Sequence, residues 1–254
     1  MAIIRNNAFF DASGSIGDIT FRNVNGRIIV SRKITHTNSN TPKQRACRNS
    51  FGQMSKLAKS LKLIINAGFD PIENGSKYNH FYKANAALAD FISRNNIKDC
   101  DNLPVCMLYN VLADEAFTGQ VLSARGNMDA RSEFVIDAEG QVSGLLSLSR
   151  AFKAGDSITA GIALLVDVHR RLMETVVLQT YALAPPDIEG LTSPNQFLIN
   201  KKNWEALNAC ALSPLQGAIR GVVITAIVDG PPDRAGRPNR STAYFSLPAT
   251  GQKK

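Results

Sequence analysis

Residues 35–51 read T-H-T-N-S-N-T-P-K-Q-R-A-C-R-N-S-F, and in them a polar segment gives way to a basic, partly apolar one. Thr41 is a residue type that commonly caps the start of a helix, and Pro42 suits the first helical position. Gln44 stands three residues after Thr41 and completes a capping box. This stretch therefore predicts the start of a helix.

The predicted helix covers residues 42–66, and Gly68 is a natural stop. Its apolar residues recur at intervals of four and three, which places them on one stripe. They are Cys47, Phe51, Met54, Ala58, Leu61 and Ile65. The basic residues Arg45, Arg48, Lys56, Lys59 and Lys62 fall on a separate face. We expect the helix to bury the apolar stripe and to present the basic face.

The net charge of +8 is concentrated in the first quarter of the chain. Residues 1–63 hold 11 of the 29 lysines and arginines but only 2 of the 21 acids, which gives +9 there and −1 in the remainder. Residues 19–69 contain no acid at all. A solvated helix face usually mixes charge signs, so this asymmetry favours a negatively charged partner surface.

A β-hairpin is predicted upstream of the helix. Asn25-Gly26 is typical of a type I′ turn, and β-forming residues flank it over 18–24 and 27–34. Neither face of this hairpin is cleanly polar, and an isolated hairpin is marginally stable in water. We therefore expect it to pack against the rest of the chain or against a neighbouring molecule.

A second helix is predicted over residues 77–95, which would form an αα unit with the first. Further on, six β-rich runs separated by turns cover residues 104–111, 131–137, 156–168, 174–183, 217–229 and 241–247. The run 156–183 has the pattern of a long hairpin. The predicted fold is α+β and mainly β. Residues 1–98 would form an N-terminal arm, hairpin and basic helical pair, and residues 99–254 an antiparallel immunoglobulin-like β-sandwich.

The chain of 254 residues carries no recognisable catalytic motif. It has no G-x-S-x-G elbow, no H-E-x-x-H and no Walker-type loop. The four cysteines lack zinc-site spacing, which favours reduced thiols. The sequence also has no secretion signal or membrane-length apolar run. We therefore expect a non-enzymatic protein made in the cytoplasm, with no cofactor, no metal site and no membrane partner.

The predicted partner-binding residues are the basic ones of the N-terminal region. They are Arg27, Arg32, Lys33, Lys43, Arg45, Arg48, Lys56, Lys59 and Lys62. Three functions are considered for the chain, in order of preference. The favoured one is assembly with other proteins or with copies of the same chain. A glycan-binding module that reads sugars with its sandwich loops and Trp204 is second, and nucleic-acid binding by the basic quarter is third.

The order of several short motifs resembles an uncharacterised domain-of-unknown-function family that is common in Bacteroidota and in their phages and prophages. The motifs are Gly14 to Asp18, the central Asn25-Gly26-Arg27, and Asn40-Thr41-Pro42 followed by Gln44, Arg48 and Phe51. The resemblance continues in Ala67-Gly68-Phe69, in the Tyr82 to Leu88 helix and in Arg240-Ser241-Thr242-Ala243-Tyr244. The first 90 residues match specifically, and the loop 229–240 looks like an insertion.

That resemblance implies no known reaction. The phage association implies a virion component such as a head auxiliary, neck or tail protein, so that the expected location is the virion. Its partners would be other virion proteins or copies of itself in a homo-oligomeric assembly. Such proteins often join their neighbours through an arm or hairpin that adds a strand.

Overall fold

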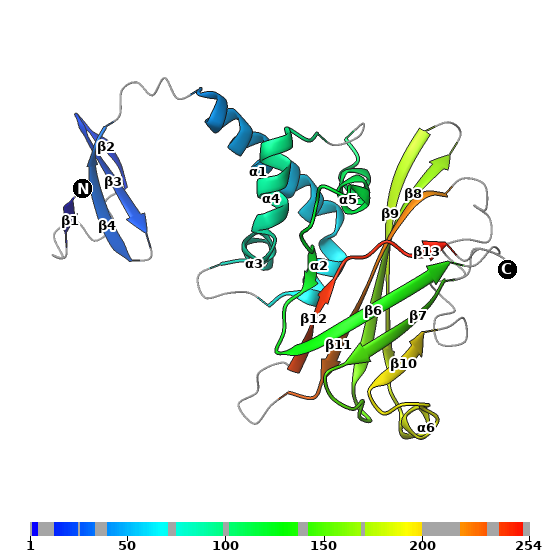
Figure 1. Ribbon diagram of the computed structural model, residues 1–254. Coiled ribbons are helices and arrows are strands. Elements are labelled where there is room, and N and C mark those ends of the chain that lie inside the picture. Colours follow the sequence, from blue (N-terminus) through cyan, green and yellow to red (C-terminus); the bar gives the residue numbers. More distant parts are fainter. Residues whose placement is uncertain are drawn as a thin grey trace. The chain divides into compact units, whose positions relative to one another are not determined.

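A computed structural model describes residues 2–4, 13–24, 26–33, 40–70, 75–98, 102–136, 142–168, 171–199, 219–232 and 239–250 (Figure 1). The chain divides into two compact units, Met1–Arg45 and Ala46–Lys254. Its described elements mix helices and strands, with strands in the majority. The mixed, mainly β composition predicted from the sequence is therefore confirmed.

The first unit contains a four-stranded antiparallel sheet with the strand order β1-β4-β3-β2. Its strands are β1 (Ala2–Ile4), β2 (Gly14–Ile16), β3 (Ile19–Val24) and β4 (Arg27–Arg32). The predicted hairpin is confirmed, since Val24 pairs with Arg27 across a two-residue turn and Gly26 has a φ of 74°. Asn25 lies outside the described residues. The two short outer strands were not predicted.

The second unit contains a nine-stranded sheet with the order β10-β7-β6-β12-β11-β8-β9, while β13 pairs with β6 and β5 with β12. The strands are β5 (Leu122–Ala124), β6 (Met128–Ile136), β7 (Val142–Leu148), β8 (Ser157–Val168), β9 (Arg171–Ala182), β10 (Gln196–Ile199), β11 (Ile219–Gly230), β12 (Asn239–Tyr244) and β13 (Ala249–Thr250). The predicted hairpin 156–183 is confirmed by continuous pairing of β8 with β9.

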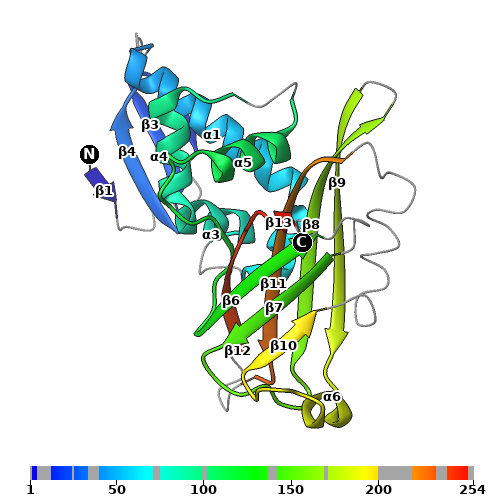
Figure 2. The same cartoon turned by 45° about the vertical axis from the view of Figure 1, so that its right-hand side comes forward.

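This sheet curls, so that β6, β7 and β10 lie over β8 and β11 in both views (Figures 1 and 2). Along β8 the side chains alternate between two cores. Ile162 and Leu164 point into the curl, where they pack with residues such as Phe134 and Leu146. Ala163 and Leu165 point to the opposite face, where they pack against the helices. Strand β11 also contributes side chains to both cores, so the central strands β8 and β11 are buried on both faces.

Helices cover the outer face of that curled sheet (Figure 2). They are α1 (Pro42–Ser60), α2 (Lys62–Gly68), α3 (Lys77–Ala84), α4 (Ala86–Asn95) and α5 (Pro104–Ala113), and a short α6 (Pro185–Glu189) follows β9. The capping box is confirmed, because the Gln44 N–H donates to Thr41 Oγ1 at 3.3 Å and the Thr41 N–H donates to Gln44 Oε1 at 3.2 Å. The two long helices predicted from the sequence are each broken, at Leu61 and at Asn85.

The prediction of a strand over residues 104–111 was wrong, because these residues form α5. A short run that is apolar on every side cannot be assigned to strand or helix by periodicity alone. Pro104 at the first helical position was the available signal for a helix. The helix is largely apolar because six of its ten residues are buried.

The sandwich predicted for residues 99–254 is supported only in its mainly β composition. The second compact unit runs from Ala46 to Lys254, whereas the predicted boundary lies between residues 98 and 99. Leu57 of α1 and Leu108 of α5 share one core with Val223 of β11, so the helices and the sheet bury each other's apolar surface. The described strands of this unit form one hydrogen-bonded sheet, in which β12 and β13 run parallel to β6. The antiparallel immunoglobulin-like topology is not confirmed.

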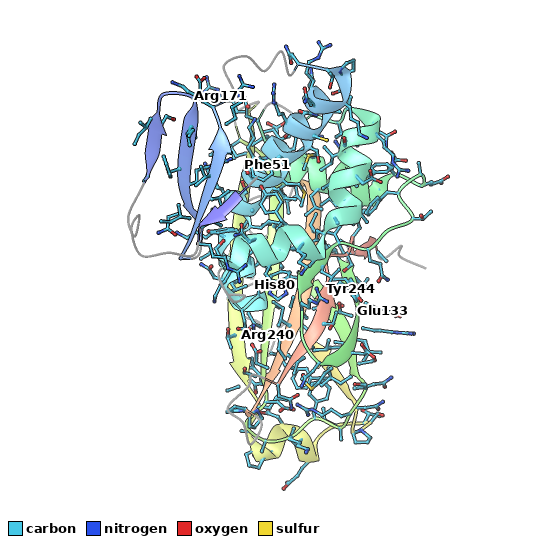
Figure 3. The ribbon with its side chains drawn as sticks, turned by 90° about the vertical axis from the view of Figure 1, so that its left-hand side faces the viewer. Phe51, His80, Glu133, Arg171, Arg240 and Tyr244 are labelled. Carbon is cyan, nitrogen blue, oxygen red and sulfur yellow. The ribbon has the colours of Figure 1, made fainter. Side chains whose placement is uncertain are left out.

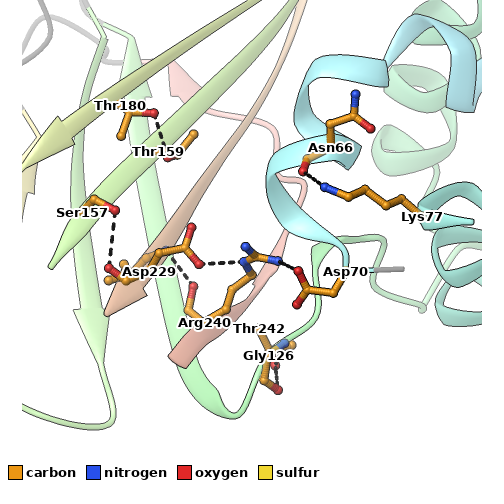
Figure 4. Close-up of polar contacts among 12 residues, drawn as sticks. Asn66, Asp70, Lys77, Gly126, Ser157, Thr159, Thr180, Asp229, Arg240 and Thr242 are labelled. Carbon is orange, nitrogen blue, oxygen red and sulfur yellow. Dashed lines mark hydrogen bonds and ion pairs between the residues drawn. The ribbon is translucent and has the colours of Figure 1, made fainter. Parts of the chain in front are cut away.

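A charged contact joins the helical layer to the sheet (Figure 4). The Arg240 guanidinium on β12 donates to Asp229 at 2.7 Å and to Asp70, just after α2, at 3.0 Å. Burial raises the pKa of Asp229, the positive charge of Arg240 opposes that rise, and the negative charge of Asp70 adds to it. A guanidinium with two carboxylate partners fixes the end of the β11–β12 pair against the segment that follows α2.

Candidate partner-binding surfaces

The nine predicted partner-binding residues are all exposed, and they are divided between the two compact units. Arg27, Arg32, Lys33, Lys43 and Arg45 belong to the first unit. Arg48, Lys56, Lys59 and Lys62 belong to the second, where Lys62 follows the break at Leu61 and the other three lie on α1.

We call Arg48, Lys56 and Lys59 the α1 basic stripe. At 100° per residue these three side chains fall within about 80° of the helix circumference, on the side away from Leu57 and Leu61. Lys56 Nζ donates to Asn102 Oδ1 at 3.1 Å. The helices α1 and α2 contain no acidic residue. The stripe therefore presents positive charge that its own helices do not offset.

Gly52 lies in the middle of this stripe. A Cβ atom added to it would meet no atom within 4 Å. Glycine in an exposed helix interior costs about 1 kcal/mol relative to alanine. Because packing within the chain does not require a glycine here, its effect is to leave the helix backbone open to close approach from outside.

The buried face of α1 differs from the predicted apolar stripe. Met54, Ala58, Leu61 and Ile65 are buried as expected, but Cys47 is exposed and Phe51 is 66% exposed. In their place α1 buries Ser50, Gln53 and Leu57. Ser50 is satisfied there because its Oγ donates to the Ala89 carbonyl of α4 at 2.6 Å. The interpretation of Phe51 as a core anchor was wrong.

The exposed Phe51 instead forms an aromatic pair with the half-buried Tyr82 of α3. The two rings stack with centroids 5.3 Å apart and an interplanar angle of 21°. The Tyr82 hydroxyl donates to the Phe51 carbonyl at 3.2 Å and also contacts Ser55 Oγ. Burial raises the pKa of Tyr82, and the Ser55 hydrogen bond opposes that rise. Tyr82 thus holds the Phe51 ring in place beside Arg48.

The sheet of the first unit has an apolar face of its own. Strand pairing aligns Phe21 with Val30, and Ile19 with Ile16, and alternation places all four on one face. Ile16 is 74% exposed and Ile19 45% exposed, while Phe21 and Val30 are half-buried. Within this unit's described residues, Ile28 is the one apolar side chain that is buried. An exposed apolar sheet face next to Arg32 and Lys33 has the character of a docking surface.

A groove with a volume of about 350 Å³ lies between α6, the segment after it, and the outer face of β7 and β10. Leu145, Pro186, Leu191 and Leu198 form its apolar lining, and Asp187 adds a carboxylate. Asp187 accepts hydrogen bonds from the Tyr181 hydroxyl at 2.9 Å and from the Ala184 N–H at 2.8 Å. The hydrogen bond to Asp187 raises the pKa of Tyr181. The sequence alone did not reveal this groove.

Other features bear on the predicted chemistry. In the part of the chain that the structure describes, no cluster of three or more His, Cys, Asp or Glu residues could hold a metal ion. Across the same residues, no helix combines the length and the apolarity needed to cross a bilayer. Trp204, which the glycan-binding hypothesis uses, lies outside the described residues.

Comparison with known proteins gives no family for this chain. No protein-family model matches it, and no curated protein matches it. The resemblance to the domain-of-unknown-function family stays a prediction.

Proposed function

We propose that this is a non-enzymatic assembly protein, a component of a phage particle, that docks through its basic N-terminal region onto acidic protein surfaces. The main observation in support is that the exposed lysines and arginines of α1 lie beside the exposed ring of Phe51. Neither α1 nor α2 contains an acidic residue. Aromatic anchors surrounded by polar rims dominate the binding energy of many protein interfaces. The partner surfaces belong to other virion proteins or to copies of the same chain.

The first unit supports the same proposal. Its apolar sheet face carries the exposed Arg32, which pairs with Ile19, and the two would together suit an acidic partner surface with an apolar centre. The proposed location in a virion rests on the family resemblance. A structural role of this kind requires no catalysis. Electrostatic complementarity would set the register of docking more than its raw strength.

Nucleic-acid binding is the second candidate function, and one observation favours it. An exposed aromatic ring next to a basic stripe is the arrangement on which bases stack while cations contact phosphates. Proteins that bind single strands usually carry a series of such rings, whereas among the described residues of α1 Phe51 is the one aromatic side chain. Protein docking is therefore the better fit.

We further propose that the curled sheet is a variant of the immunoglobulin-like sandwich. The support is that β6, β7 and β10 face β8 and β11 across one apolar core, as two stacked sheets would. Loops at the ends of such a sandwich would offer the glycan-binding alternative its surface. A titration of sugars monitored by Trp204 fluorescence addresses that alternative, since a sugar that stacks on Trp204 changes its emission.

Charge reversal tests the proposed function. The variant Arg48→Glu/Lys56→Glu/Lys59→Glu should stay folded and lose the ability of the full-length chain to form particles larger than a monomer in light scattering. Arg125→Glu, a reversal at an exposed arginine just after β5, is the control and should assemble normally. If the triple variant assembled as well as the natural chain, the proposal would fail. If the natural chain bound DNA with a steep salt dependence and never assembled, nucleic-acid binding would replace it.

A further inference from the structure

We propose that this chain associates with itself head to tail, with Phe51 and the α1 basic stripe of one copy docked in the groove between α6 and β10 of the next. This inference rests on the proposed assembly function and names the partner surface. Both surfaces lie within the second unit.

We call Phe51 with the α1 basic stripe the donor surface, and the groove between α6 and β10 the acceptor surface. Phe51 is the anchor of the donor surface. Phe51 is 66% exposed and its ring is held by Tyr82, so little side-chain freedom is lost when it docks. Arg48, Lys56 and Lys59 lie along one side of α1, next to Phe51, and would flank the contact with positive charge. Gly52 lets a partner approach the helix backbone between them.

The acceptor surface complements the donor surface in its exposed apolar side chains and in its acidic charge. Leu145 is 37% exposed and Leu198 56% exposed, which is unusual for a pair of leucines side by side on a sheet. Asp187 lines the groove and Glu189 ends α6. Glu133 of β6 lies beside Leu145 in the strand register.

Among the described residues, the acids exceed the bases around this groove by one charge. The bases are Arg131, on the same outward face of β6 as Glu133, and Lys153, which follows Phe152, whose N–H donates to the Pro194 carbonyl at 2.8 Å. The acids are Asp187, Glu189 and Glu133. Acidic residues beside exposed leucines match a basic stripe beside an exposed phenylalanine, and this complementarity selects the second copy as the occupant.

The two surfaces lie at opposite ends of the second unit, with α1 at one end and α6 at the other in both views (Figures 1 and 2). Phe51 and Glu133 are also well separated in the side-chain view (Figure 3). One copy therefore cannot bring its own helix to its own groove. A contact between two different surfaces is heterologous, so it propagates from copy to copy into a ring or a filament.

Mixing two blocked variants tests this geometry with the full-length chain. Phe51→Ser removes the anchor and leaves the groove intact, whereas Leu198→Lys blocks the groove and leaves the anchor intact. Each variant alone should weaken self-association about 30-fold or more, as expected for a hot-spot residue. An equimolar mixture should form a heterodimer that stops at two chains in sedimentation velocity. Two variants that stay monomeric when mixed would overturn the proposal.

A charge exchange separates loss of the contact from loss of folding. The variant Arg48→Glu/Lys59→Glu and the variant Glu133→Lys/Glu189→Lys should each fail to self-associate, and one chain carrying all four changes should regain assembly. Failure of that combined chain, with circular dichroism that matches the natural protein, would contradict the inference. If Phe51→Ser and Leu198→Lys both assembled normally while deletion of residues 1–40 abolished assembly, the proposed function would stand and this inference would fall.

Discussion

Glu174 on β9 accepts the backbone N–H of Val105 at 2.9 Å, and so it supplies the cap that helix α5 lacks in its own sequence. The residue before the helix is Leu103, which has no side-chain acceptor. The other Glu174 oxygen accepts the Ser60 hydroxyl at the end of α1. One carboxylate thus joins two helices to the sheet, at a helix N-terminus where negative charge is favourable.

Replacing Glu174 with alanine should lower the free energy of unfolding by about 1–3 kcal/mol, because a capping hydrogen bond and a side-chain hydrogen bond are lost together. Urea denaturation followed by circular dichroism measures this change. Glu133→Ala is the matched control, since Glu133 lies exposed on β6. Equal midpoints for both variants would show that Glu174 does not cap α5.

Two helical glycines should respond oppositely to alanine. At Gly68 a Cβ atom would lie 2.1 Å from the Ser123 carbonyl oxygen, so Gly68→Ala must displace α2 from β5 and should destabilise the protein by more than about 2 kcal/mol. At Gly52 the same change meets open space and should stabilise it by up to about 1 kcal/mol. Thermal unfolding of both variants gives the comparison. A stabilising Gly68→Ala would mean that α2 does not pack this closely on β5.

The pH dependence of stability should carry the signature of Asp229. Its pKa is raised in the folded protein, so between the ordinary aspartate pKa and this raised value the folded state binds more protons than the unfolded state. The contribution of Asp229 to stability is therefore present at low pH and falls as the pH rises through that window.

Comparing the natural chain with Asp229→Asn isolates this effect. Relative to the variant, the natural chain should lose stability as the pH rises from about 4 towards neutrality. Urea midpoints at a series of pH values provide the measurement. A natural chain that instead gained stability over this range would mean that attraction to Arg240 outweighs the cost of burying the carboxylate.

Local signals in the sequence predicted several elements correctly. Thr41 and Gln44 defined the start of α1 because a capping box involves neighbouring residues only. Asn25-Gly26 predicted the β3–β4 hairpin because the turn fixes the pairing of its two strands. The long β8–β9 hairpin was also recognised from its two β-rich runs.

The buried side of α1 could not be settled from spacing alone. Both the predicted stripe and the observed face follow helical periodicity, and the choice between them depends on what packs nearby. The Ala89 carbonyl accepts from Ser50 and so makes a polar residue acceptable in the interior. Phe51 is left outside as a consequence.

The candidate surfaces were predictable to different degrees. The exposure of Arg48, Lys56 and Lys59 followed from the pattern, because strongly charged residues rarely lie buried. The groove did not, because Leu145, Asp187 and Leu198 come together only through the pairing of β7 with β10 and the position of α6. The continuous apolar runs of β8 and β11 were an unused signal that both faces of the sheet are covered.

The most direct test of the assembly account is the mass in solution of the full-length chain and of a variant that lacks residues 1–40, each at low and high salt. The account predicts an assembly larger than a monomer for the full-length chain at low salt, a shift towards the monomer at high salt, and fewer chains per particle for the truncated chain at the same concentration. The same number of chains per particle for both chains at both salt concentrations would contradict it.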